Sequence, residues 1–158
     1  MFGAQSDLRT VFVVCQAVIS ISTCHFGWFD VNLHVLCWRI MNIEEVRYYA
    51  LTLPGAQEDL PYGPDWLVFR IEGMIFLHIW LEAPQPTCAL KLEPEYGQWV
   101  RSHYNGVRPA YHLNKVHWND IYLDIIEDKL VKEWISRSYS LVMSKLPKRL
   151  RTKYEQLS

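Results

Sequence analysis

Three short runs of β-branched and aromatic residues, at positions 66–71, 74–81 and 87–92, constrain the fold of this chain more than any other feature. Glu72-Gly73 separates the first two runs and is a tight hairpin signal. Prolines in the stretch 83–86 give a looser second turn and keep that stretch out of strand pairing. The three runs therefore predict an antiparallel meander.

Three other segments have the apolar spacing of helices with one buried stripe. Asn42 is a good N-cap for the first segment, and Pro54-Gly55 ends it. Pro94 suits the first turn of the second segment, and Pro147 stops the third. The predicted helices span residues 42–53, 93–103 and about 127–146.

Two further extended runs, 107–113 and 117–123, flank Asn114-Lys115-Val116 and predict a second hairpin. Residues 56–65 are rich in proline and glycine and predict a loop. The expected order is α-β-β-β-α-β-β-α, with a sheet of about five strands. Antiparallel hairpins with helices packed on one face predict an α+β two-layer sandwich.

The composition changes at Met41. The first 40 residues hold four charged side chains, whereas the other 118 hold 29. We expect residues 1–40 to be a non-native or disordered extension, read through from upstream, and residues 41–158 to form a single domain. A signal peptide and a membrane span are the alternatives for the apolar run 11–22, but no clean cleavage site follows it and polar residues interrupt it early.

Charge and cysteine content bound the class of protein. Cys88 is the only cysteine after residue 40, so the body of the chain supports no internal disulfide and we expect a cytoplasmic protein. The formal net charge of -1 removes the simplest argument for a nucleic-acid binder. Residues 129–158 nevertheless carry eight basic and two acidic side chains. Such a segment can neutralise phosphates, or it can be an ordinary solvated helix end.

From Met41 onward the chain resembles the MmcQ/YjbR family. The segment from Tyr111 to Asn119, with its His-x-Asn-Lys-x-His-Trp-Asn pattern, is the most specific match. The other matching pieces are Leu53-Pro54-Gly55, Glu58 with Pro61-Tyr62-Gly63, Lys91 with Pro94-Glu95, Gly106 with Pro109, and Ser138-Tyr139 leading to Lys145-Leu146-Pro147-Lys148. The resemblance implies a small bacterial cytoplasmic protein with a CyaY-like or secretion-chaperone-like fold and a double-wing DNA-binding role.

Two positions depart from the family pattern. Arg70 stands where family members often carry lysine, and Leu92-Glu93 stands where a Cys or Ser usually follows the strand lysine. These departures bear on any contact made at the strand ends.

The hairpin around Asn114 has the polar and aromatic density of a contact loop. Asn114 is suited to a base edge, Lys115 to a phosphate and Trp118 to stacking. The alternative is a hairpin in which Trp118 is core and Asn114 supplies turn geometry. The full set of candidate DNA contacts is Arg70, Lys91, His112, Asn114, Lys115, His117, Trp118, Lys145, Lys148, Arg149 and Arg151.

Two other binding functions stay open. An exposed aromatic surface on the sheet would favour a protein partner, and the candidate side chains are Trp66, Phe69, Phe76 and Trp80. A small-ligand site near His112, Asn114 and His117 would need a concave pocket there.

We expect neither an enzyme nor a bound metal or cofactor, and we expect a monomer. The sequence has no Ser-His-Asp ordering and no Gly-rich phosphate loop, and Cys88 lies in an apolar strand where a thiol is inert. The candidate metal ligands His78, His103, His112 and His117 lack the cysteine or carboxylate that would complete a ligand set.

Overall fold

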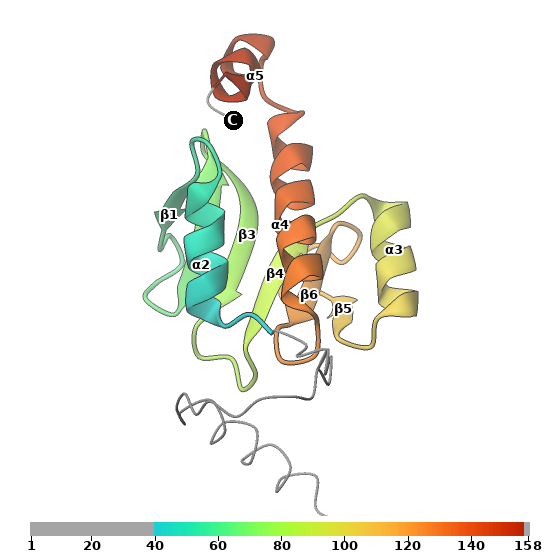
Figure 1. Ribbon diagram of the computed structural model, residues 1–158. Coiled ribbons are helices and arrows are strands. Elements are labelled where there is room, and N and C mark those ends of the chain that lie inside the picture. Colours follow the sequence, from blue (N-terminus) through green and yellow to red (C-terminus); the bar gives the residue numbers. More distant parts are fainter. Residues whose placement is uncertain (1–39, 157–158) are drawn as a thin grey trace, which may run out of the picture. The chain divides into compact units, whose positions relative to one another are not determined.

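The computed structural model describes residues 40–156, which form an α+β fold around an open antiparallel sheet (Figure 1). Its helices are α2 (Ile43–Thr52), α3 (Pro94–His103), α4 (Asp128–Met143) and α5 (Lys148–Glu155). Its strands are β1 (Gln57–Asp59), β2 (Trp66–Ile71), β3 (Met74–Trp80), β4 (Thr87–Lys91), β5 (Val107–Pro109) and β6 (Trp118–Tyr122). The predicted extension, residues 1–40, lies outside the described residues apart from Ile40, which forms a β-bridge with Glu127.

All neighbouring strands pair antiparallel, in the order β1-β2-β3-β4-β6-β5. The predicted meander of β2, β3 and β4 and the predicted hairpin of β5 and β6 are both confirmed. Strand β6 also pairs with β4, so the hairpin extends the meander into one sheet. The predicted fold class is therefore confirmed.

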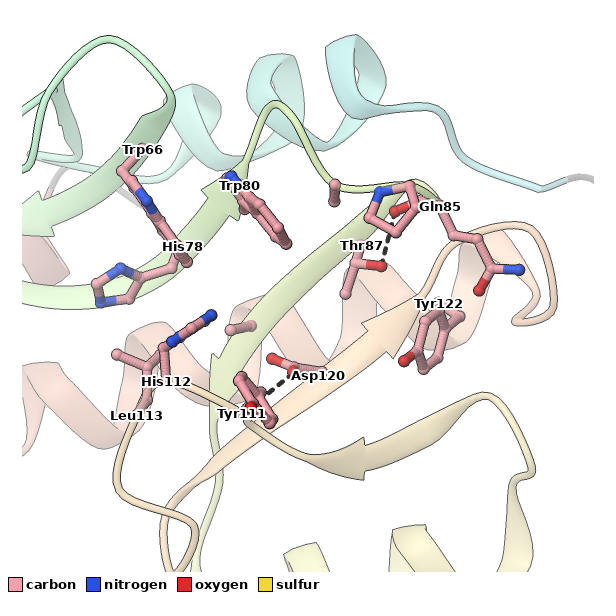
Figure 2. A pocket seen from close by; sticks show the side chains of 13 residues that line it. Trp66, His78, Trp80, Gln85, Thr87, Tyr111, His112, Leu113, Asp120 and Tyr122 are labelled. Carbon is pink, nitrogen blue, oxygen red and sulfur yellow. Dashed lines mark hydrogen bonds between the residues drawn. The ribbon is translucent and has the colours of Figure 1, made fainter.

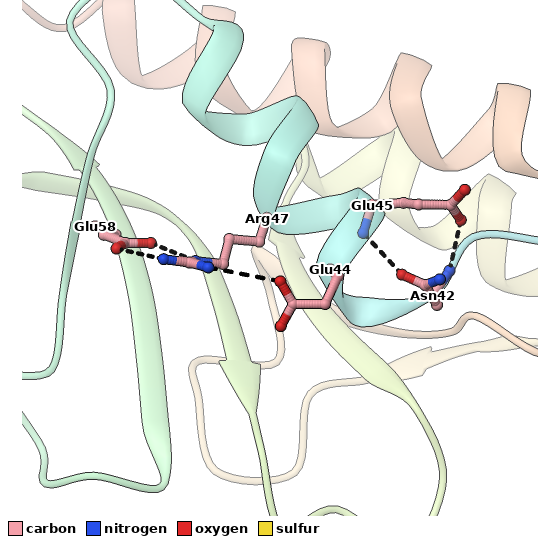
Figure 3. A network of polar contacts seen from close by, with 5 residues as sticks. All are labelled: Asn42, Glu44, Glu45, Arg47 and Glu58. Atoms are coloured by element: carbon pink, nitrogen blue, oxygen red, sulfur yellow. Dashed lines mark hydrogen bonds and ion pairs between the residues drawn. The ribbon is translucent and has the colours of Figure 1, made fainter.

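The sheet has six strands, one more than expected, because β1 lies in the segment predicted to be a loop. All three residues of β1 are exposed, so they carry no apolar alternation that would mark a strand. Two arginine contacts hold β1 in place. Arg47 of α2 donates to both carboxylate oxygens of Glu58 at 2.7 and 2.8 Å (Figure 3), and Arg70 of β2 lies 2.9 Å from Asp59.

Helix α2 begins where the sequence predicts. The Asn42 side chain accepts a hydrogen bond from the Glu45 backbone N–H at 2.8 Å, and the Glu45 carboxylate accepts from the Asn42 N–H at 3.0 Å (Figure 3). This reciprocal capping box satisfies backbone donors that would otherwise be unpaired at the helix start.

The main core lies between one face of the sheet and the helices α2 and α4 (Figure 1). Alternate residues of β2, namely Leu67, Phe69 and Ile71, point to this face. Trp134 and Ile135 of α4 are buried against it. No helix of residues 40–156 covers the other face of the sheet, which is called the open face below.

A β-bulge at Phe76 changes the register between β2 and β3. Arg70 pairs with Ile75, whereas the preceding residue of β2, Phe69, pairs with Leu77. Phe76 is therefore an extra residue of β3 with no partner on β2. The ladder between β3 and β4 stops at the pair of Leu77 and Leu90.

Ser138 of α4 fills the gap left by that irregularity. Its hydroxyl donates to the Phe76 carbonyl at 2.5 Å and accepts from the Lys91 backbone N–H at 2.9 Å. Phe76 and Lys91 are the next pair in the β3–β4 register, so the hydroxyl bridges two groups that would otherwise have bonded to each other. Ser138 is fully buried, and it ties the central helix to both strands.

The predicted last helix, about 127–146, corresponds to α4, and the structure adds a further helix, α5, that we did not predict. Helix α4 ends at Met143, and α5 starts after Pro147. The Tyr154 hydroxyl of α5 donates to the Glu72 carboxylate in the β2–β3 turn. Its ring also packs on Gly55, where φ is +72° and an added Cβ would lie 2.3 Å from the ring. These contacts hold α5 against the β2–β3 turn and against the turn that follows α2.

The predicted strand 107–113 ends at Pro109. Residues 110–117 form a long loop, since the chain leaves β5 and crosses the open face before β6 begins. No helix within residues 40–156 combines the length and apolar character needed to cross a membrane.

We expect Ser138→Ala to lower the free energy of unfolding by about 2 kcal/mol, because it leaves a buried carbonyl and a buried N–H without a partner. Urea denaturation followed by circular dichroism measures the change. Ser140→Ala is the matched control, since Ser140 is exposed on the same helix. Equal stability of the two variants would contradict the role assigned to Ser138.

Candidate ligand pocket on the open face of the sheet

The open face presents a row of aromatic side chains across β2 and β3. Trp66 and Trp80 are register partners, and their rings stack with centroids 5.7 Å apart and planes 6° from parallel. Phe69 and Phe76, which we also expected on an exposed surface, are fully buried on the helix side. That expectation was wrong because Phe69 alternates with Trp66 along β2 and Phe76 occupies the bulge.

The loop 110–117 covers part of the open face. Ala110 and Leu113 of the loop pack with Ala89 and Trp118 to form a second, smaller apolar cluster. The Tyr111 backbone N–H donates to the Asp120 carboxylate at 3.1 Å, which fixes the loop over the adjacent strand. The loop therefore shields one end of the open face and leaves the tryptophan end uncovered.

Between the loop and the tryptophan pair lies a pocket of about 220 Å³ (Figure 2). Its lining includes Trp66, Trp80, Thr87, His112, Asp120 and Tyr122. The His112 ring stands edge-on to both Trp66 and Trp80, at centroid distances of 5.7 and 6.2 Å. In Figure 2 the side chains of Trp80, His112 and Asp120 converge on the same space. The site therefore has flat aromatic walls and one carboxylate.

Asp120 is the polar group that sets the electrostatics of this pocket. Burial raises its pKa, and the Tyr111 hydrogen bond and the proximity of His112 oppose that rise. The described residues that line the pocket include no lysine or arginine. A carboxylate whose negative charge is not neutralised by a neighbouring lysine or arginine attracts hydrogen-bond donors and cations and repels anions.

His78 forms the floor between the pocket and the Trp118 cluster. Its ring is stacked with Tyr62 and meets the Trp118 ring edge-on at 4.8 Å. Burial lowers the pKa of His78 to about 4, and the charge of Lys91 adds to the effect. The imidazole is therefore neutral near pH 7, and its Nδ1 is buried without a hydrogen-bond partner among the described residues.

The hairpin residues that we assigned to DNA contacts differ in exposure: some are buried in the fold and others face solvent. Trp118 is buried, with 8% of its surface exposed, and Lys91 Nζ lies 4.9 Å from the centre of its ring. Asn114 shapes the loop, because its side chain accepts from the Val116 N–H and its carbonyl accepts from the Trp118 N–H. Lys115 is exposed, and the carbonyl of the half-buried His117 accepts from Leu92.

Of the other assigned residues, Arg70 is paired with Asp59 and Lys91 is half-buried. Burial lowers the pKa of Lys91, and the positive charge of Lys145 lowers it further. Lys145, Lys148 and Arg149 are exposed, and Arg151 is half-buried. The structure thus brings Lys91 and Lys145 together, and it brings His112 into the pocket without Asn114 or His117.

Within residues 40–156, no group of three or more His, Cys, Asp or Glu side chains is placed to hold a metal ion. Cys88 is fully buried as a free thiol, and burial raises its pKa, which keeps it protonated.

Sequence reasoning did not identify Asp120, Thr87 or Tyr122 as site residues. The sequence feature that could have identified two of them is the alternation of side chains along a strand. In β6 it places Asp120 and Tyr122 on the same face of the sheet as Trp118. The contact between Tyr111 and Asp120 could not be read in advance, since it depends on the path of the loop across the sheet.

Comparisons with known proteins agree with this fold. The family model described as YjbR matches residues 51–141. The YjbR protein of Escherichia coli K12 is 31% identical over 120 residues, which cover 74% of this chain and all of that protein. The YbdF protein of Escherichia coli O157:H7 is 34% identical over 107 residues, covering 67% of this chain and 88% of that protein.

Two solved structures are similar as well. The Deinococcus radiodurans protein DR2400, with a DUF419 domain, is 27% identical, covers 73% of this chain and 89% of its own, and has a TM-score of 0.66. A crystal structure of a Pseudomonas syringae protein is 26% identical, covers 65% and 99%, and has a TM-score of 0.57. On the family match and the curated relatives, this chain belongs to the YjbR family.

Proposed function

We propose that this protein is a binding protein that takes a small, flat organic ligand in the pocket on its open face. The stacked pair of Trp66 and Trp80, open to a pocket beside Asp120, is the observation that supports this function. Aromatic walls with a few convergent polar groups are typical of small-molecule sites. The volume of about 220 Å³ lies below the roughly 300–1,000 Å³ typical of drug-sized ligands, so one small ring system is the expected occupant.

DNA is a second candidate partner, and a separate observation supports it. The exposed side chains Lys145, Lys148 and Arg149 make no ion pair within residues 40–156. The charges of Lys91 and Lys145 lie close enough for one to lower the pKa of the other. Uncompensated neighbouring cations favour a polyanion such as the DNA backbone.

We expect Trp80→Ala to weaken the binding of one- and two-ring aromatic fragments about tenfold, since it removes half of the stacking wall. Titrations followed by the indole N–H signals in ¹H–¹⁵N spectra give the dissociation constants. Trp99→Ala is the control, because Trp99 has a similar exposure on α3 but lies outside the pocket. Fragments that bind both variants equally well would argue against this site.

We expect Asp120→Asn to raise the melting temperature at pH 7. A carboxyl group whose pKa is raised by folding destabilises the folded state above that pKa, and the asparagine amide removes the charge while it still accepts from Tyr111. The gain should shrink as the pH falls toward 3.8, the ordinary value for aspartate, and vanish well below it, where both states are protonated. The titratable groups around Asp120 include His78, His112, Arg108 and Cys88. Melting curves at pH 7 and pH 3 test both statements.

For the DNA candidate, we expect Lys145→Glu to weaken duplex binding and to reduce the slope of log affinity against log salt by about 1. Lys129→Glu is the control, because it makes the same charge change on an exposed residue at the opposite end of α4. Fluorescence anisotropy with a labelled duplex at several salt concentrations measures both. Equal losses in the two variants would indicate a non-specific effect of net charge.

A further inference from the structure

The pocket contains more than a hydrophobic wall, and its polar groups restrict which rings can bind. Asp120 Oδ2 accepts one hydrogen bond, from the Tyr111 N–H, while Oδ1 has no hydrogen-bond partner among the described residues. An ionised carboxylate offers about four acceptor positions and no donor. Unused acceptor capacity therefore remains on the side of Asp120 that faces the hollow in Figure 2.

No other polar group of the described pocket lining donates a hydrogen bond to the free acceptor positions of Asp120. The Thr87 hydroxyl donates to the Gln85 carbonyl at 2.9 Å, so its proton is already engaged. Arg108 on β5 is the direct register partner of Asp120, but it forms no ion pair with Asp120 among the described residues, and its guanidinium lies 5.9 Å from the centre of the Tyr122 ring. Asp120 is partly buried and forms no ion pair with a lysine or arginine among residues 40–156, so the nearby His112 only partly offsets its charge. Such a carboxylate is suited to recognise a donor supplied by a ligand.

The geometry of the walls sets the shape of that donor. Trp66 and Trp80 stack nearly parallel, and His112 stands almost perpendicular to both. A flat ring can lie against such surfaces by offset or edge-to-face contact, with its own edge directed at a neighbouring polar group. A carboxylate is matched most strongly by two adjacent N–H donors in a fork.

We propose that the pocket selects flat nitrogen heterocycles that present an amidine-type edge, with two adjacent N–H donors, to the Asp120 carboxylate. This inference rests on the proposed ligand-binding function and specifies its ligand class. Guanine-type and pterin-type rings both carry such an edge. The aromatic walls supply affinity for any flat ring, and Asp120 supplies the discrimination.

Three probes of similar two-ring size test this on the full chain by calorimetry. 2-Aminobenzimidazole carries the amidine edge, 2-methylbenzoxazole has the same shape without N–H donors, and benzimidazole-2-carboxylate is an anion. We expect 2-aminobenzimidazole to bind at least tenfold more tightly than either of the others. 9-Methylguanine and pterin then show which of the two ring types binds more tightly.

Asp120→Asn separates the donor edge from the general affinity for rings. We expect this variant to lose about tenfold in affinity for 2-aminobenzimidazole and to leave 2-methylbenzoxazole binding unchanged, because only the first probe needs the second acceptor and the charge. Its melting curve shows that it is folded. Trp80→Ala should weaken both probes.

The outcomes distinguish the two levels of the proposal. Equal binding of the donor and donor-free probes, with no effect of Asp120→Asn, would overturn the ligand class and leave the proposed function standing. Absence of binding by every probe at millimolar concentration, with no change in the Trp66 and Trp80 indole signals, would overturn both.

Discussion

The bridge that Ser138 makes between β3 and β4 is the contact on which the arrangement of this sheet depends. A β-bulge leaves backbone groups unpaired, and a buried unpaired carbonyl or N–H is strongly destabilising. The Ser138 hydroxyl accepts from one strand and donates to the other, so the bulge at Phe76 is tolerated in the middle of the sheet. The bulge adds one residue to β3. The side chains of β3 that follow Phe76 therefore point to the opposite faces of the sheet from those they would occupy in a strand without a bulge.

That change of face creates the pocket. A two-residue turn at Glu72-Gly73 without a bulge would pair Trp66 with Ile79 and turn Trp80 toward the helices. The one-residue shift instead pairs Trp66 with Trp80 and places both on the open face. The elements themselves follow from apolar periodicity, capping and turn residues, which is why the helix at Asn42, the meander and the second hairpin could be predicted. The bulge could not, because it depends on a serine 62 residues away in the sequence.

The most specific sequence motif of the chain serves mainly to shape a loop, which its polar and aromatic composition did not indicate. The segment from His112 to Asn119 is dense in polar and aromatic groups, as a contact loop would be. In the structure Asn114 organises the turn, Trp118 is buried, and Asn119 accepts from Arg101 and donates to the His117 carbonyl. The motif therefore builds the loop that carries Tyr111 and His112 to the pocket, and a sequence pattern alone does not separate this role from direct contact.

The two faces of the sheet differ in how well their polar groups are satisfied. On the helix side, the fully buried Ser138 and Asn119 both have hydrogen-bond partners. On the open face, Arg70 Nε and His78 Nδ1 are buried without a partner among the described residues, and burial raises the pKa of Asp120. Polar groups left in this state lower stability, and groups with unsatisfied hydrogen bonds or shifted pKa values are frequent at functional sites. The distribution of these groups therefore favours the open face as the functional face, whether its ligand is a small ring or a larger partner.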